Sequence, residues 1–245
     1  MSASLPDPPG PWQPWTSGLV ARPCAGCRGR GGPLCGECWR EFGRSAHTVD
    51  VRPRPPGLPS VSAAAEYAGP VREAIVAFKD HGRWSLRAPL AAALSHAVAH
   101  ALLEAELPHY VHLVPVPGSP GSAHARDGAH VDELAARAAV LLTQEGVRTT
   151  VATVLTPVRR RRDQVGLGRD ERAANLAGSV VALGEARRVL APVASDPRRR
   201  RRHAAVLVDD LVTTGATLAE CARALRDVGV EPVGAAVVAG VARRS

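Results

Sequence analysis

The residues with the clearest chemical potential lie in the run AAVLVDDLVTTGAT, residues 204–217. Val206–Val208 is apolar and mostly β-branched, which is typical of a strand buried on both faces of a parallel sheet. Asp209 and Asp210 follow directly, so we expect two carboxylates at the carboxyl end of that strand. From about Ala216 the apolar residues recur at helical spacing as far as a glycine, which predicts a helix.

The segment between the predicted strand and helix is suited to a phosphate. A helix N-terminus presents unpaired backbone N–H groups, and Gly215 would let that backbone approach a ligand without a side chain in the way. The two carboxylates suit the vicinal hydroxyls of a sugar. The pattern therefore predicts a ribose 5-phosphate site, against the simpler interpretation of an acidic, threonine-rich turn. Its candidate residues are Asp209, Asp210, Thr213, Thr214, Gly215, Ala216 and Thr217.

A second set of candidate ligands lies near the amino terminus. Cys24 and Cys27 form one CxxC pair, and Cys35 and Cys38 form another after seven intervening residues. This spacing is typical of four thiolates on one tetrahedral zinc ion. Because the protein would fill all four positions, we expect structural zinc; redox-active CxxC pairs are the alternative.

The elements that must position these residues alternate between strands and helices, which predicts an α/β fold with a mostly parallel sheet flanked by helices. Ligands collect at the carboxyl edge of such sheets, so the loop 117–130 should lie beside Asp209. We expect strands at 65–67, 111–116, 149–155, 206–208 and 233–238, and helices from 69, at 86–106, 131–143 and 216–229.

Proline-rich and cysteine-rich stretches divide the 245 residues. We predict a flexible leader at 1–20, a four-cysteine zinc module at 21–46, a Pro-rich linker at 47–60 and the α/β domain at 61–245. The amino terminus lacks the pattern of a targeting signal, and polar residues interrupt the most apolar segment, 88–107. We therefore expect a cytoplasmic protein with no membrane span.

The net charge of +8 favours phosphorylated ligands or nucleic acid as partners. Lys79 is the only lysine among the 31 basic residues. Two arginine runs stand out, at 159–162 and 198–202. The first is either a solvated loop or a lid over a charged ligand, and the second is either a surface connection or a contact for single-stranded DNA.

The motif VLVDDLVTTGAT resembles the site for phosphoribosyl pyrophosphate (PRPP) in type I phosphoribosyltransferases. Over about residues 24–239, the order of cysteine module, YxGPVRExIxxFKxxGR segment, VPVP strand and DDLVTTGAT resembles the ComF family, which is associated with DNA uptake in competent bacteria. The resemblance implies a type I phosphoribosyltransferase fold, structural Zn²⁺, PRPP with Mg²⁺, and transfer of phosphoribosyl to an unidentified acceptor. It also implies an alternative function, that of an accessory protein that binds single-stranded DNA beside a DNA-uptake helicase.

The resemblance also implies roles for single residues. Asp209, Asp210 and Arg172 would be catalytic. The pyrophosphate side and lid would comprise Val116, Pro117, Arg126, Arg160, Gln164 and Asn175. The chain departs from the family where an RGFNQ-like segment is usual, because residues 126–131 read RDGAHV. It departs again at Thr213, where purine-salvage relatives often carry an acid as general base.

Overall fold

The predicted strands assemble into one mixed sheet in the computed structural model, which describes residues 23–43, 46–103, 110–118, 129–158, 178–190 and 203–241. Only β1 runs antiparallel, to β2, and all other neighbours are parallel, as predicted. In sheet order the strands are β1 (His47–Thr48), β2 (Val61–Glu66), β8 (Gly234–Gly240), β7 (His203–Val212), β3 (Tyr110–Pro115) and β4 (Arg148–Val151).

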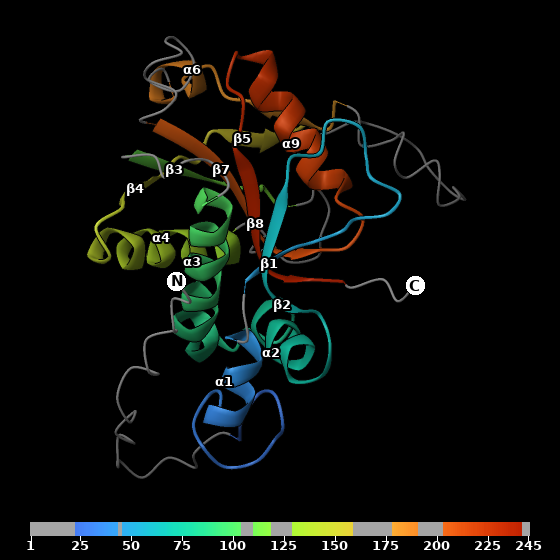
Figure 1. Cartoon of the computed structure of the whole chain (residues 1–245), viewed down its shortest axis with the longest axis vertical. Coiled ribbons are helices and arrows are strands. Elements are labelled where there is room, and N and C mark those ends of the chain that lie inside the picture. Colours follow the sequence, from blue (N-terminus) through green and yellow to red (C-terminus); the bar gives the residue numbers. More distant parts are fainter. Residues whose placement is uncertain are drawn as a thin grey trace.

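Helices cover both faces of this sheet because successive strand residues point to opposite sides. Val206 and Val208 of β7 pack in one core cluster, and Leu207 packs in the other. The first cluster lies under α2 (Gly69–Lys79), α3 (Arg87–Leu103, after the 3₁₀ turn η1 at Trp84–Leu86) and α4 (Ala129–Gln144). The second lies under α9 (Ala216–Asp227) and the short α6 (Ala186–Val189). Figure 1 shows α1 (Gly36–Phe42) beside α2 at one end of the molecule and α6 and α9 at the other.

The order of the strands creates a crevice between β3 and β7. The chain leaves β3 through α4 to reach β4, and it leaves β7 through α9 to reach β8 on the other side. The two helices cover opposite faces, so the sheet has its topological switch point between these neighbouring strands. Ligands of open α/β sheets bind at such a point, outside the carboxyl ends of the strands.

Three predicted strands differ from the expectation. The strand predicted at 65–67 begins earlier and ends at Glu66, as β2. The strand predicted at 149–155 is divided into β4 and β5 (Leu155–Pro157), and β5 pairs antiparallel with β6 (Val180–Ala182) as a separate ribbon. Ala152 and Val154 are buried between the two strands, which explains the continuous apolar pattern. The strand predicted to stop before the two acids continues through them as β7 to Val212.

The Pro-rich segment 47–60 packs on the domain. Its first two residues form β1, and Val49, Val51 and Leu58 are buried against the second core cluster. Val49 lies so close to β8 that a Cβ on Gly240 would meet its Cγ2 at 2.7 Å. The domain boundaries at 20, 46 and 60 stay predictions.

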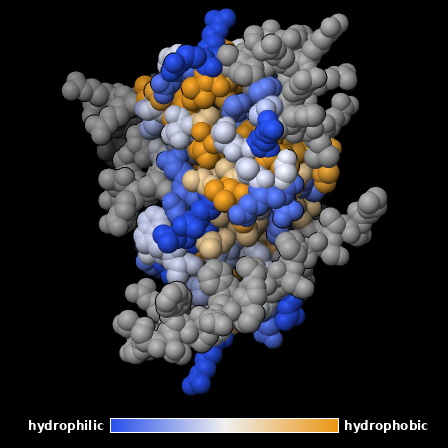
Figure 2. Space-filling model, turned by 90° about the vertical axis from the view of Figure 1, so that its left-hand side faces the viewer, coloured by the Kyte–Doolittle hydropathy of each residue, from blue (hydrophilic) through white to orange (hydrophobic). Residues whose placement is uncertain are grey.

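The helical stretch Trp84–Leu103 is long and apolar enough to pass as a membrane span by length and composition. The core helix of a water-exposed domain passes the same test, and α3 here packs against α4, β2 and β8. Its histidines His96 and His100 are half-buried, and His100 Nδ1 lies 2.9 Å from Ser62 Oγ. On the side that carries α4 and β4, hydrophobic and hydrophilic residues are mixed at the surface (Figure 2).

Candidate functional site

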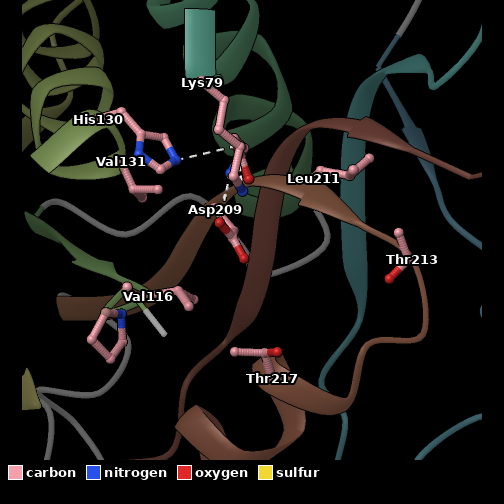
Figure 3. Close-up of a pocket in the computed structure, with 11 residues that line it drawn as sticks. Lys79, Val116, His130, Val131, Asp209, Leu211, Thr213 and Thr217 are labelled. Atoms are coloured by element: carbon pink, nitrogen blue, oxygen red, sulfur yellow. Dashed lines mark hydrogen bonds and ion pairs between the residues drawn. The ribbon is translucent and has the colours of Figure 1, made fainter. Parts of the chain in front are cut away.

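A pocket of about 230 Å³ opens at the switch point (Figure 3). Val116 and Pro117 reach it from the end of β3, where the Val116 amide still donates to Val208 O at 2.9 Å. Asp209, Asp210 and the turn after β7 form its other wall, so the predicted proximity of the two strand ends is confirmed. The remaining lining residues are Lys79, Gly118, His130, Val131, Leu211, Thr213 and Thr217.

The turn after β7 has the strand-to-helix form that was predicted. Thr213 and Thr217 are exposed and line the pocket, and α9 begins at Ala216. Thr214 Oγ1 accepts a long hydrogen bond of 3.4 Å from the Ala216 amide. Thr214, Gly215 and Ala216 are not among the residues that line the pocket.

Gly215 is needed for a different reason from the one expected. It has φ +71°, and a Cβ there would meet Leu58 Cδ2 at 2.8 Å and Val51 Cγ1 at 3.5 Å. The missing side chain therefore faces the packed 47–60 segment rather than the pocket. A left-handed conformation and a close hydrophobic neighbour both require glycine at this position.

The two acids differ in their surroundings. Asp210 is 3% exposed, and its Oδ2 lies 3.2 Å from Lys79 Nζ and 3.3 Å from His130 Nε2. Asp209 is half-buried, and its Oδ1 accepts a hydrogen bond from the Asp210 amide at 2.8 Å. In Figure 3 the Asp209 side chain points toward the open space bordered by Val116 and Thr217.

These surroundings move the two pKa values apart. Burial and the neighbouring charge of Asp210 raise the pKa of Asp209 well above its usual range. Burial would also raise the pKa of Asp210, but the contact with His130 and the charge of Lys79 outweigh it and lower the pKa to about 2. The two neighbouring carboxyls therefore have pKa values that depart from the usual value in opposite directions.

Lys79 and His130 were not predicted as site residues. Lys79 comes from the end of α2 and His130 from the start of α4, so neither is near the acids in sequence. One signal was available for Lys79, because it is the only lysine in an arginine-rich chain. His130 lies in the RDGAHV segment, which had been noted only as a departure from a family pattern.

Several predicted residues lie outside the described part of the chain. These are Arg126, Arg160, Gln164, Arg172 and Asn175, together with both arginine runs. Strand β5 precedes the segment 159–177 in the sequence, and β6 follows it. The Val158 amide donates to Ser179 O, and the Val180 amide donates to Glu220 Oε1 on α9. The lid and DNA-contact interpretations stay predictions.

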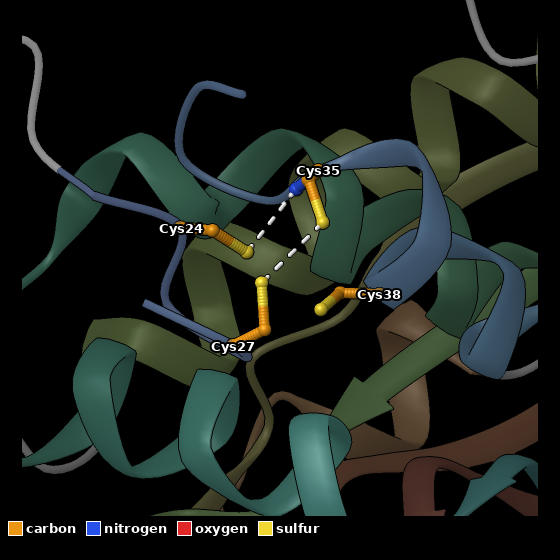
Figure 4. A group of neighbouring side chains, drawn as sticks. All are labelled: Cys24, Cys27, Cys35 and Cys38. Carbon is orange, nitrogen blue, oxygen red and sulfur yellow. Dashed lines mark hydrogen bonds between the residues drawn. The ribbon is translucent and has the colours of Figure 1, made fainter. Parts of the chain in front are cut away.

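The four cysteines meet as predicted (Figure 4). Their Sγ atoms lie within 4.8 Å of one another, and those of Cys27 and Cys35 are 3.7 Å apart. Zinc bonds of about 2.3 Å in a tetrahedron place sulfurs about 3.8 Å apart, so the cluster fits that ion. Burial raises the pKa of the Cys24 thiol, but backbone N–H groups, including the Cys35 amide 3.2 Å away, outweigh it and lower the pKa to about 6.

The cysteine module is attached to both ends of α2. A Cβ on Gly26 would lie 2.8 Å from both Cys38 Sγ and Pro70 Cβ, at the start of that helix. Beyond its other end, the Arg83 guanidinium donates to Pro23 O. The helix that brings Lys79 to Asp210 therefore packs against the four-cysteine module.

Metal removal tests the module. We expect purified protein to contain about one zinc ion per chain and Cys38→Ser to lose it, because structural zinc needs all four thiolates. Elemental analysis measures the metal, and thermal unfolding with and without chelator measures its contribution to stability. A metal-free native protein whose cysteines cycle between thiol and disulfide would support the redox alternative.

Gly215→Ala tests the turn. We expect the free energy of unfolding to fall by about 2–4 kcal/mol, because alanine is strained at positive φ and its Cβ overlaps Leu58. Urea denaturation measures this change. Because the overlap is removed with the Leu58 side chain, Gly215→Ala should cost less in a Leu58→Ala background; an equal cost in both would contradict the packing.

The low pKa of Asp210 predicts a pH dependence. A carboxyl with a pKa lowered from 3.8 to about 2 stabilises the fold above the higher value, and this stabilisation is lost as pH falls between the two. The full effect is about 2 kcal/mol. We expect the single variant Asp209→Asn to have a higher free energy of unfolding at pH 6 than the double variant Asp209→Asn/Asp210→Asn. This difference should shrink as the pH is lowered toward 2. A constant gap in denaturant titrations would contradict the ionised Asp210.

Comparison with known proteins agrees with the site. Residues 139–245 match the family model described as "Phosphoribosyl transferase domain", a span that includes β7, the two acids and the turn before α9. No curated protein matches the chain. The match, the mostly parallel sheet and the four-cysteine cluster together agree with a phosphoribosyltransferase-like fold that carries a cysteine cluster near its amino terminus.

Proposed function

We propose that the pocket binds PRPP with Mg²⁺ and that the protein transfers the phosphoribosyl group to an acceptor. The observation that carries this is the juxtaposition, at the switch point of the sheet, of a pocket-facing carboxylate and the amino end of α9. The carboxylate suits the ribose hydroxyls, and the helix end suits the 5-phosphate. The match of residues 139–245 to a phosphoribosyl transferase domain supports this assignment.

The chain's own residues would hold the sugar between two anchors. Backbone N–H groups of the turn 213–217 would donate to the 5-phosphate, and Asp209 would accept from a ribose hydroxyl. The C1–oxygen bond to pyrophosphate breaks, pyrophosphate leaves with the electron pair, and the acceptor nucleophile bonds to C1. Magnesium bound to the pyrophosphate oxygens would neutralise their charge. Val116 and Pro117 border this side of the pocket.

No carboxylate occupies position 213, where purine-salvage relatives often have their base. Thr213 is exposed at the pocket and cannot act as a base at neutral pH. The acceptor would therefore be a nucleophile that needs no base from this turn, or one that loses its proton to another group.

The more specific ComF assignment belongs to the same proposal. It is supported by the four-cysteine cluster and by the segment around Lys79, which lies at the pocket. A cytoplasmic location would accompany it. The DNA and helicase partners of that family depend here on arginine runs outside the described residues and stay predictions.

Binding of PRPP tests the proposal directly. Titration calorimetry with PRPP and Mg²⁺ should show saturable binding to the wild type, and Asp209→Asn should weaken it at least about tenfold, since a hydrogen bond between a carboxylate and a ribose hydroxyl is worth about 1.5–3 kcal/mol. Asp132→Asn, on the nearby helix α4 but outside the pocket lining, is the matched control. Absence of wild-type binding, or equal binding by Asp209→Asn, would contradict the site.

Turnover is a separate measurement. Pyrophosphate release from PRPP should appear when a suitable acceptor is supplied, so a screen over nucleobases and other amines would identify it. PRPP binding without release for any acceptor would favour a sensor of PRPP over a transferase.

A further inference from the structure

Asp209 and Asp210 differ in what surrounds them, although both lie in strand β7. Up to Val208 the side chains of this strand alternate between the two core clusters, but Leu211 packs against the cluster of Val206 and Val208, and Val212 belongs to the cluster of Leu207. The alternation is therefore broken beside the acids, and the position of each acid follows from its own contacts.

The contacts of Asp210 place its side chain on the side of the sheet that carries α2 and α4. Lys79 reaches it from the end of α2, and the His130 ring reaches it from the start of α4. His130 is itself 5% exposed and packs edge-on to Phe78, with ring centroids 6.1 Å apart. Asp210 Oδ2 has no measurable accessible surface, so a ligand in the pocket could not reach it without displacing Lys79 or His130.

We propose that the two acids have separate tasks: Asp209 alone binds the ligand hydroxyls, whereas Asp210 is a buried counter-ion through which Lys79 and His130 hold α2 and α4 against β7 at the pocket. Lys79, His130 and Asp210 are then positioning residues. The part concerning Asp209 rests on the proposed function. The part concerning Asp210 does not, because it follows from contacts within the chain.

Energetics favour this division. An unpaired buried carboxylate is costly, and two nitrogen atoms 3.2 and 3.3 Å from Asp210 Oδ2 offset that cost. If Asp210 turned to a sugar hydroxyl, it would exchange a charged partner, Lys79, for a neutral one. Asp209 is half-buried at the pocket, and its Oδ1 accepts a hydrogen bond from the Asp210 amide, so its other oxygen could accept from a sugar hydroxyl.

Lys79 offers a direct probe because it is the only lysine of the chain. Protein labelled with ¹³Cε,¹⁵Nζ-lysine, without lysine in any tag, gives a single side-chain NMR signal. We expect Asp210→Asn to move this signal and Asp209→Asn to leave it in place. Saturating ribose 5-phosphate should also leave it near its ligand-free position. If the ligand instead shifts the Lys79 signal of the wild type to the chemical shift seen in Asp210→Asn, the proposal is overturned, because the ligand would then release Lys79 from Asp210.

Affinity and stability separate the two acids independently. With ribose 5-phosphate or PRPP and Mg²⁺, Asp209→Asn should lose affinity at least tenfold, whereas Asp210→Asn, measured well below its melting temperature, should stay within about threefold of wild type. Asp210→Asn should instead lower the melting temperature. Tenfold loss of affinity in both variants with unchanged melting temperatures would make both acids ligand residues and overturn the division.

A rescue experiment tests the counter-ion role without any ligand. Lys79→Met leaves Asp210 with an uncompensated charge, so it should lower the melting temperature, and adding Asp210→Asn should recover part of that loss. Additive losses would overturn the counter-ion role. If the wild type fails to bind PRPP while this rescue succeeds, the proposed function is wrong and the Asp210 assignment stands.

Discussion

A buried carboxylate at the edge of the sheet imposes the central constraint on this structure. Asp210 is only 3% exposed, and the cost of burying its carboxylate is offset by Lys79 of α2 and His130 of α4, whose nitrogen atoms lie 3.2 and 3.3 Å from its Oδ2. This contact joins β7 to the ends of α2 and α4, and the pocket forms where these elements meet. The position of α2 in turn depends on the cysteine module at its two ends.

Close packing gives the rest of the site its shape. The cores contain few large side chains, and alanine predominates in α3 and on its neighbours, which allows helices to lie near the sheet. Packing is equally close at Gly215, where Leu58 occupies the space that a Cβ would need. The turn that faces the pocket is thus shaped from behind by a segment that looks like a linker in the sequence.

Much of the fold could be predicted because its signals are local. The apolar run before Asp209, the helical spacing after Ala216 and the paired CxxC motifs each depend on neighbouring residues, and the structure confirms them. Three features could not be predicted in this way. The division of the strand at 149–155, the packing of residues 47–60 and the contacts of Lys79 and His130 all depend on which distant segments become neighbours.

The sequence by itself determined which functional groups are available and in what order: two adjacent carboxylates before a turn suited to phosphate, and four thiolates spaced for one metal ion. It did so because each motif lies within a short stretch whose backbone geometry follows from local pattern. Only the tertiary structure decided how the two carboxylates differ. Packing brings Lys79 and His130 to the buried Asp210, whereas Asp209 is only half-buried at the same pocket.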